Sequence, residues 1–209
     1  MSSVNDVNSK ITPKGIHSRQ KIIDAAITSF KVKGYQETTI QDICFIAGIA
    51  VGTFYHYFSS KHDLLFVMIA EMNTTLTTAY QKMDIKSYPD AILQLTDLFI
   101  DIYESYGPEL ITNMYKGYVL SGKNLFDINQ FAYVIIIRDI FARGIKEKQF
   151  SIDFAVDDVA EMVKSIFFLS SVLWCNHHDI NVFRDNAHRK IEAFLQLVSS
   201  DEVNNIEQE

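Results

Sequence analysis

The chain has 209 residues, of which 48% are hydrophobic and 22% are charged, with three prolines. This composition indicates a packed globular protein, one domain or a small domain joined to a larger one, and excludes a disordered chain. The formal net charge is −7, but residues 1–63 carry seven Lys and Arg against five Asp and Glu, so they have a net charge of +2 and the remainder −9. The acidic total therefore does not exclude nucleic-acid binding by the mildly basic N-terminal part.

The apolar segments and the cysteines exclude further classes of protein. Residues 131–137 and 166–175 are apolar, but both are shorter than the roughly 18 to 20 residues of a membrane-spanning helix, so we expect buried helices and no membrane association. The N-terminal residues lack the apolar run of a signal peptide, which predicts a cytoplasmic protein. Cys44 and Cys175 form no CxxC pair, which excludes a cysteine zinc site and a disulfide framework.

The first predicted helix follows a polar arm of residues 1–15. Ile23, Ala26, Ile27 and Phe30 recur at the i, i+3, i+4, i+7 spacing of one helix face, and Gly34 is placed to end the helix. This spacing predicts a helix that buries one apolar stripe.

Two short helices are predicted next. Thr39, with Asp42 three residues later, has the pattern of a capping box and starts a helix that Gly48 ends after about two turns. A third helix spans about residues 50–58. Two short helices joined by a tight turn containing glycine are typical of the helix-turn-helix motif, whose second helix enters the major groove of DNA.

The rest of the chain is also predicted to be helical. Ser60 and Asp63 form a second capping box, which opens a long helix reaching about residue 83. Five more helices are expected at residues 90–106, 109–121, 125–148, 154–177 and 182–199, followed by an acidic tail at residues 200–209. No sustained apolar and polar alternation indicates a sheet, so the predicted fold class is all-α with about nine helices.

The aromatic run in the third helix divides into two faces. On a helical wheel Phe54 and Phe58 lie about 40° apart, while Gly52, Tyr55 and His56 spread over the opposite side. The first pair is expected to pack on the first helix. The second set is expected to face outward, where rings with polar tips suit phosphate contacts and a glycine allows close approach of a backbone.

Two features adjoin this helix. The N-terminus of the following long helix, with Lys61, is an expected anion site because its backbone N–H groups lack partners within the helix. An alternative interpretation of residues 55–57 is that they only cover the junction with the larger helical region.

Residues 19–64 resemble the DNA-binding domain of the TetR-type transcriptional regulators. The segment IIDAAITSFKVKGYQETTIQDICFIAGIAVGTFYHYFSSKHDL contains the family elements G-Y-x-x-T-T-x-x-x-I, A-G-(V/I) and G-T-(F/L)-Y-x-Y-F-x-x-K in register. The resemblance implies a flexible arm at 1–15, a helix-turn-helix DNA-binding domain at 16–63 and a helical effector-binding and dimerisation domain at 64–199. It also implies a homodimer formed through the last two long helices, with each third helix contacting half of a palindromic double-stranded DNA operator.

Carried over by position, the resemblance implies a set of DNA-contact residues: Thr39, Ala50, Val51, Gly52, Thr53, Tyr55, His56, Tyr57 and Lys61. Many relatives have Ser or Thr where this chain has Ala50, so one phosphate-binding hydroxyl is missing. Base recognition is then expected from Val51, Thr53 and His56, including contacts with thymine methyl groups.

The larger domain has apolar spacing suited either to a dimer interface or to an internal core. Positions 159, 162, 163, 166, 167, 173 and 174 repeat at helical spacing, as do positions 191, 194, 195 and 198. Two such helices can pair with their copies in a four-helix contact with two-fold symmetry. Intramolecular packing is the alternative.

Aromatic residues suggest a pocket for a small organic effector, uncharged or amphipathic. The candidates are Phe99, Tyr103, Tyr115, Tyr118, Phe126, Phe131 and Trp174. The alternative for each of them is ordinary core packing, which aromatic stripes at helical spacing usually represent.

The sequence offers no convincing catalytic or metal site. His177, His178 and Asp179 are adjacent and point apart on a helix, so they are expected to close a helix end and to bind no metal. No G-x-S-x-G, H-E-x-x-H or P-loop motif is present, and no cofactor is expected. The predicted function is a ligand-responsive repressor and not an enzyme. The alternatives are a DNA-binding helical protein with a filled core and no effector, in a scaffolding or nucleoid-associated role, and an enzyme with a vestigial N-terminal domain.

Overall fold

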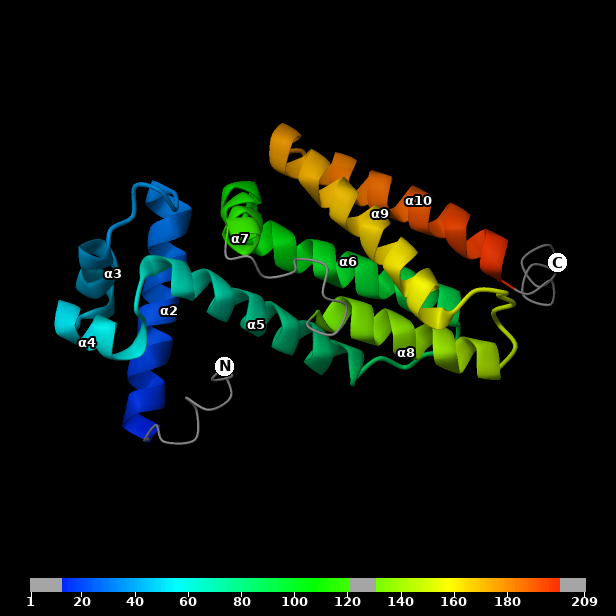
Figure 1. Ribbon diagram of the computed structural model, residues 1–209, viewed down its shortest axis with the longest axis horizontal. Coiled ribbons are helices and arrows are strands. Elements are labelled where there is room, and N and C mark those ends of the chain that lie inside the picture. Colours follow the sequence, from blue (N-terminus) through cyan, green and yellow to red (C-terminus); the bar gives the residue numbers. More distant parts are fainter. Residues whose placement is uncertain (1–12, 121–130, 200–209) are drawn as a thin grey trace. The chain divides into compact units, whose positions relative to one another are not determined.

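A computed structural model describes residues 13–120 and 131–199, except the side chains of Tyr118 and Leu120, and within these ranges it contains nine α-helices (Figure 1). The predicted all-α class is confirmed. The chain divides into two compact units, Met1–Ile69 and Ala70–Glu209, and this boundary falls inside helix α5 (Lys61–Tyr80). The boundary expected from the sequence lay earlier, between residues 63 and 64.

The first unit contains α2 (Pro13–Lys33), α3 (Ile40–Ala47), α4 (Val51–Tyr57) and the beginning of α5. Helix α2 starts at Pro13, because proline fits the first turn of a helix, where no N–H donor is needed. Residues 13–15 therefore belong to a helix and not to the expected arm, whose residues 1–12 lie outside the described ranges. Gly34 has φ 81°, a left-handed conformation that ends α2 where the sequence predicted.

Both predicted capping boxes are present. The Asp42 N–H donates to Thr39 Oγ1 at 3.1 Å, and the Thr39 N–H donates to Asp42 Oδ2 at 2.9 Å. The equivalent bonds between Ser60 and Asp63 measure 3.3 and 3.2 Å. Gly48, with φ 65°, ends α3 after eight residues. These local signals fix the lengths of the short helices.

The core of the first unit forms from the predicted apolar faces. Ile23, Phe30 and Ile43 are buried, and so are Phe54 and Phe58, whose ring centroids lie 5.7 Å apart. The guanidinium of Arg19, on α2, lies 5.3 Å from the centroid of the Phe58 ring. The predicted inward orientation of this aromatic pair is confirmed.

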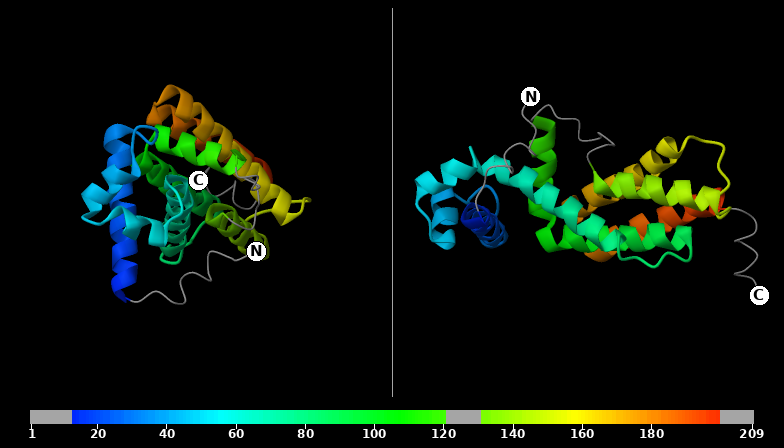
Figure 2. Two further views of the ribbon diagram at one scale, coloured as in Figure 1. Left: turned by 60° about the vertical axis from the view of Figure 1, so that its left-hand side comes forward. Right: turned by 90° about the horizontal axis from the view of Figure 1, so that it is seen from below.

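The second unit contains the end of α5 and five further helices: α6 (Tyr88–Tyr106), α7 (Pro108–Leu120), α8 (Ala132–Lys146), α9 (Val156–His177) and α10 (Ile180–Val198). Helices α6, α8, α9 and α10 pack in a closed cycle, in which each contacts the next, and α7 packs on α6 and α9 (Figure 2). None of the described helices is both long and apolar enough to cross a bilayer.

Most predicted helices of this unit differ from the observed ones only at their ends. Helix α6 begins two residues early, because the Ser87 hydroxyl caps it by accepting a bond from the Asp90 N–H. Helix α5 ends at Tyr80 and not near residue 83. The predicted helix at 125–148 is observed at Ala132–Lys146, and residues 125–130 of that prediction lie outside the described ranges.

The histidine pair has the predicted place at a helix end. His177 is the last residue of α9, and His178 caps the helix with φ 61°. Asp179 caps the next helix, since its Oδ1 accepts bonds from the Asn181 and Val182 N–H groups. Across residues 13–120 and 131–199 no three His, Cys, Asp or Glu side chains gather as a metal site requires.

Candidate functional site

Helix α4 has one buried residue and an exposed outer face. Phe54 has no exposed surface, whereas Tyr55 is 55% and Val51 38% exposed, and Gly52 and His56 are exposed as well. Thr53 and Tyr57 are half-buried, and Ala50 is the exposed N-cap. The helix-turn-helix sequence thus produces a short rod fixed to its own unit chiefly through Phe54, with polar and aromatic groups available to a partner.

Gly52 lies on the exposed face of α4, and internal packing does not explain why this residue is a glycine. Glycine inside a helix costs about 1 kcal/mol relative to alanine, because of its backbone entropy. A methyl group built at Gly52 would meet no atom within 4 Å, so internal packing does not require a glycine here. The missing side chain leaves the backbone of this exposed face open to close approach.

Thr39, another predicted DNA contact, has its hydroxyl engaged in the α3 cap. Its Oγ1 donates to Asp42 Oδ2 at 2.8 Å and accepts the bond from the Asp42 N–H. Lys33 Nζ lies 2.6 Å from Asp42 Oδ1. The bond from Lys33, followed by those from the Thr39 backbone and hydroxyl, lowers the pKa of Asp42 to about 2. The exposed start of α3 is therefore rigid and carries an ionised carboxylate.

Lys61 has its ammonium directed at the loop between α2 and α3. Its Nζ donates to the carbonyl oxygens of Tyr35 at 2.5 Å, Thr38 at 2.8 Å and Gln36 at 3.2 Å. It also lies 4.4 Å from the centroid of the Tyr35 ring. Partial burial lowers the pKa of Lys61, an effect that nearby Glu37 opposes. An ammonium has three N–H groups, and this geometry gives each of them an acceptor within the protein.

The same loop is held from the other side by buried hydroxyls. Thr38 Oγ1 donates to the Gly34 carbonyl at 2.8 Å and lies 3.1 Å from Ser29 Oγ, on α2. Because Thr39 caps α3 directly after this loop, Lys61 and Thr38 together set where α3 begins. The sequence placed Lys61 near the site but gave no sign of its carbonyl partners.

Two of the candidate effector residues, Phe99 and Trp174, lie in a packed aromatic cluster. Phe99 stacks on Phe167 and on Tyr133, with centroids 4.7 and 5.0 Å apart, and Trp174 stacks on Phe183 at 5.4 Å. Of the other candidates, Phe126 and the side chain of Tyr118 lie outside the described parts of the chain. The sequence analysis missed Tyr133, Phe167 and Phe183 as cluster members, although the first two belong to apolar segments already expected to be buried.

The remaining three candidates, Tyr103, Tyr115 and Phe131, line one small cavity of about 40 Å³ together with Tyr133, Val134, Lys164, Phe167 and Phe168. The Tyr115 hydroxyl lies 2.6 Å from Ser171 Oγ and donates to the Tyr103 hydroxyl at 3.3 Å. Burial raises the pKa of Tyr115 and of Tyr133, so both remain neutral hydroxyl groups. The space suits one or a few waters and is far below the several hundred cubic ångströms of a drug-sized ligand site.

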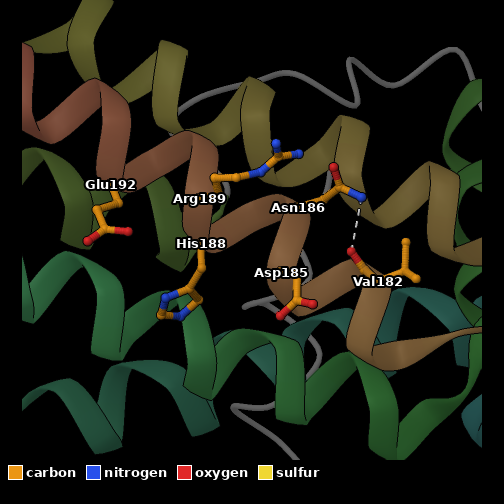
Figure 3. A pocket seen from close by; sticks show the side chains of 6 residues that line it. All are labelled: Val182, Asp185, Asn186, His188, Arg189 and Glu192. Atoms are coloured by element: carbon orange, nitrogen blue, oxygen red, sulfur yellow. Dashed lines mark hydrogen bonds between the residues drawn. The ribbon is translucent and has the colours of Figure 1, made fainter.

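The outer faces of α9 and α10 carry exposed apolar side chains. Leu169 is 55% exposed, and Met162, Val182 and Leu197 are exposed as well. Met162 and Phe194 line an open groove along these two helices. A second open groove, shown in Figure 3, is lined only by residues of α10, among them Asp185, Arg189 and Glu192. The apolar repeat of α9 and α10 thus divides between an inward core and an outward face.

Comparison with known proteins agrees with this geometry. Residues 22–68 match the tetR family of bacterial regulatory proteins. The chain is 28% identical over 168 residues to the HTH-type transcriptional repressor KstR2 of Mycolicibacterium smegmatis, covering 75% of this chain and 78% of that protein. It is 39% identical over 77 residues to the HTH-type transcriptional regulator HbdR of an Aromatoleum species, covering 36% of this chain and 34% of HbdR.

Solved structures share the fold. A TetR-family regulator from Syntrophomonas wolfei superposes with a TM-score of 0.63 at 18% identity, covering 87% of this chain and 94% of that one. FadR of Thermus thermophilus, a TetR-family repressor solved with lauroyl-CoA, gives 0.61 at 18% identity, covering 85% and 93%. Each of these relatives is named a transcriptional regulator or repressor. The capped helix-turn-helix at residues 22–68 is thus a DNA-binding domain of the tetR family, and the helical second unit shares the fold of regulators of that family.

Proposed function

We propose that this protein is a repressor that binds a palindromic operator as a homodimer and is released by a small amphipathic effector. The observation that carries the DNA half of the proposal is the exposed face of α4, with Tyr55 and His56 outward and Phe54 buried behind them. The similarity to KstR2, which is named a repressor, supports the direction of the response.

The proposed contacts divide by chemistry. Val51, Thr53 and His56 face base edges in the major groove, where a valine methyl or a threonine methyl suits thymine. Tyr55 and Tyr57 bond to phosphates, and the backbone at Ala50 and Gly52 approaches the DNA closely. Thr39 acts indirectly, because its hydroxyl and its N–H are engaged in the cap of α3. For Lys61 we propose an indirect role, in which it holds the loop before Thr39, because its N–H groups have carbonyl partners.

The homodimer is proposed to form through the outward faces of α9 and α10. Met162, Ile166, Leu169 and Leu173 follow one another at spacings of four, three and four residues, the repeat of a helix-packing seam, and all have exposed or half-buried side chains. Arg189 lies on the outer face of α10 with Asp185 and Glu192 (Figure 3). Such a face can pair with its own copy about a two-fold axis, matching the basic residue to the acidic ones. Two-fold symmetry suits half-sites about 34 Å apart.

The effector half of the proposal concerns the aromatic cavity of the second unit. Tyr103 and Tyr115 supply hydroxyl groups beside the rings of Phe131 and Phe167, a combination that suits an amphipathic molecule. The complex of FadR with lauroyl-CoA supports an effector of this class. An effector that prefers one arrangement of the helices would change the DNA affinity by shifting the population of conformations.

A second candidate function has a specific observation in its favour. The cavity measures only about 40 Å³, and the rings around it stack on one another. A DNA-binding protein with a permanently filled core and no effector would have this packing. The difference between the two candidates is whether the second unit opens for a ligand.

The experiment for the DNA half is the selection of bound duplexes from random DNA by the purified full chain. We expect a palindrome whose half-sites are one helical turn apart, and a monomer footprint or no enrichment would refute the proposal. Binding to the selected duplex is then measured with and without amphipathic compounds. If no compound lowers the affinity of the protein for the selected duplex, the candidate with a filled core and no effector is favoured.

A further inference from the structure

Lys164 is a buried lysine that lines the aromatic cavity, and no sequence motif marks it. The residue is 8% exposed and lies on the inward stripe of α9, between Val163 and Phe167. Side chains at the other inward positions of this helix are apolar or small. Burying an ammonium costs free energy that a leucine or methionine at the same place would not cost, so packing alone does not account for a lysine here.

The ion pair of Lys164 with Glu161 is open to exchange. Lys164 Nζ pairs with Glu161, one turn earlier on the same helix, and the Glu161 side chain is 38% exposed. A buried ammonium needs an anionic partner, but the partly exposed Glu161 carboxylate is not itself fixed by burial. Glu161 can therefore turn to water when another anion reaches the ammonium.

The remainder of the cavity fits an acid with an apolar body. The hydroxyl groups of Tyr103 and Tyr115, which are bonded to each other at 3.3 Å, lie at the same small space, while Phe131, Phe167 and Phe168 provide apolar walls. A carboxylate accepts charge-assisted bonds from an ammonium and hydroxyls together, and these are stronger than bonds between neutral groups. A neutral ligand would leave the buried ammonium without this gain.

We propose that the effector is an organic acid with an apolar body, whose carboxylate binds Lys164 in place of Glu161. This inference rests on the effector response proposed above and adds the chemical class of the ligand. The apolar body enters between α6, α7, α8 and α9, which all contribute to the cavity, and the cavity must enlarge from about 40 Å³ to admit it.

The test compares decanoate, 1-decanol and decanoyl-CoA as probes, below their micelle concentrations, on the full chain. The fluorescence of Trp174, the single tryptophan, reports binding, because this residue lies on α9 and stacks on Phe183 of the aromatic cluster. We expect decanoate to bind about tenfold or more tightly than decanol, as for one charge-assisted hydrogen bond.

Three variants assign the preference to Lys164. Lys164→Met keeps the aliphatic stem and should reduce the preference for the acid to about threefold or less, whereas Lys164→Arg should retain most of it. Lys116→Met removes an exposed lysine of the same unit and should change nothing. Equal binding of decanoate and decanol by the unmodified chain overturns the proposal whether or not Lys164→Met folds.

Each contrary result has its own meaning. Equal binding of acid and alcohol, or tighter binding of decanoyl-CoA that ignores the charge at position 164, overturns the recognition of a free acid but leaves the effector response in place. No binding of any probe, with DNA binding intact, overturns both the acid and the effector. If the chain without any probe binds no specific DNA sequence, the proposed function itself is overturned.

Discussion

Replacing Lys61 by methionine tests whether this residue positions the helix-turn-helix or contacts DNA itself. The change removes three hydrogen bonds to the loop between α2 and α3, two of them at 2.5 and 2.8 Å to carbonyl groups that are partly buried. Bonds from a charged donor contribute about 1.5 to 3 kcal/mol each at most, and partial solvent access reduces this, so we expect a total loss of about 2 kcal/mol in the free energy of unfolding.

Two measurements on the same variant separate the alternatives. Urea denaturation gives the stability, with Lys31→Met as a control that removes an exposed lysine from the same unit. The salt dependence of operator binding reports how many phosphates the protein neutralises, because the slope of log K against log salt concentration becomes shallower by about 0.9 for each phosphate that is no longer neutralised. We expect weaker binding with an unchanged slope, since a displaced loop moves α3 without removing a phosphate partner.

The opposite pattern would refute the positioning role. If Lys61→Met unfolded at the same urea concentration as the parent and its slope became shallower, the ammonium would be bonding to a phosphate. Lys61 would then bond to the carbonyl groups only in the protein without DNA, and to a phosphate in the complex.

Three further predictions concern other parts of the protein. Phe54→Ala should cost about 3 to 5 kcal/mol in the free energy of unfolding, as for a fully buried ring. Tyr55→Ala should unfold like the parent in urea but bind the operator at least about tenfold more weakly. Equal stability of the two variants would contradict the assignment of Phe54 to the buried face and Tyr55 to the exposed face. The pKa of Asp42 is lowered in the folded state, chiefly by Lys33. The ionised Asp42 carboxylate therefore stabilises the fold above about pH 4, and this stabilisation is lost as the pH falls toward 2. Asp42→Asn should abolish that part of the pH dependence of stability in urea titrations. Leu169→Glu should convert the proposed homodimer to monomers in analytical ultracentrifugation without loss of helicity by circular dichroism. An unchanged sedimentation coefficient would place the interface elsewhere.

The fold was largely predictable because its signals are local. The capping residues Thr39 and Ser60, with Gly34 and Gly48 as stops, are read directly from the chain, and each specifies where a helix starts or ends. The early start of α2 at Pro13 was missed because polar residues surround it and the apolar stripe begins only later.

Partners distant in the sequence could not be predicted in this way. Lys61 bonds to carbonyl groups 23 to 26 residues away, and a backbone carbonyl has no sequence signature. Lys164 is one lysine in a helical repeat, and nothing in the repeat says whether a charge at that position faces water or a cavity. The outward face of α9 was likewise hidden in an apolar pattern that serves the core and the surface together.

The small cavity and the proposed effector are compatible if the chain without ligand is mostly in its closed conformation. The apparent affinity of a ligand is then its intrinsic affinity multiplied by the fraction of open molecules, and a ligand must prefer the open form by about 10⁴-fold to convert a 1:99 population into 99:1. Apolar contacts between the ligand and the aromatic rings that the open conformation exposes would supply part of that preference. A carboxylate that binds Lys164 would supply a part that a neutral molecule of the same size lacks. Because opening the closed packing around a cavity of about 40 Å³ costs free energy, a ligand that also bonds to the ammonium offsets more of this cost than a neutral molecule of the same size, so the buried charge would select for acids.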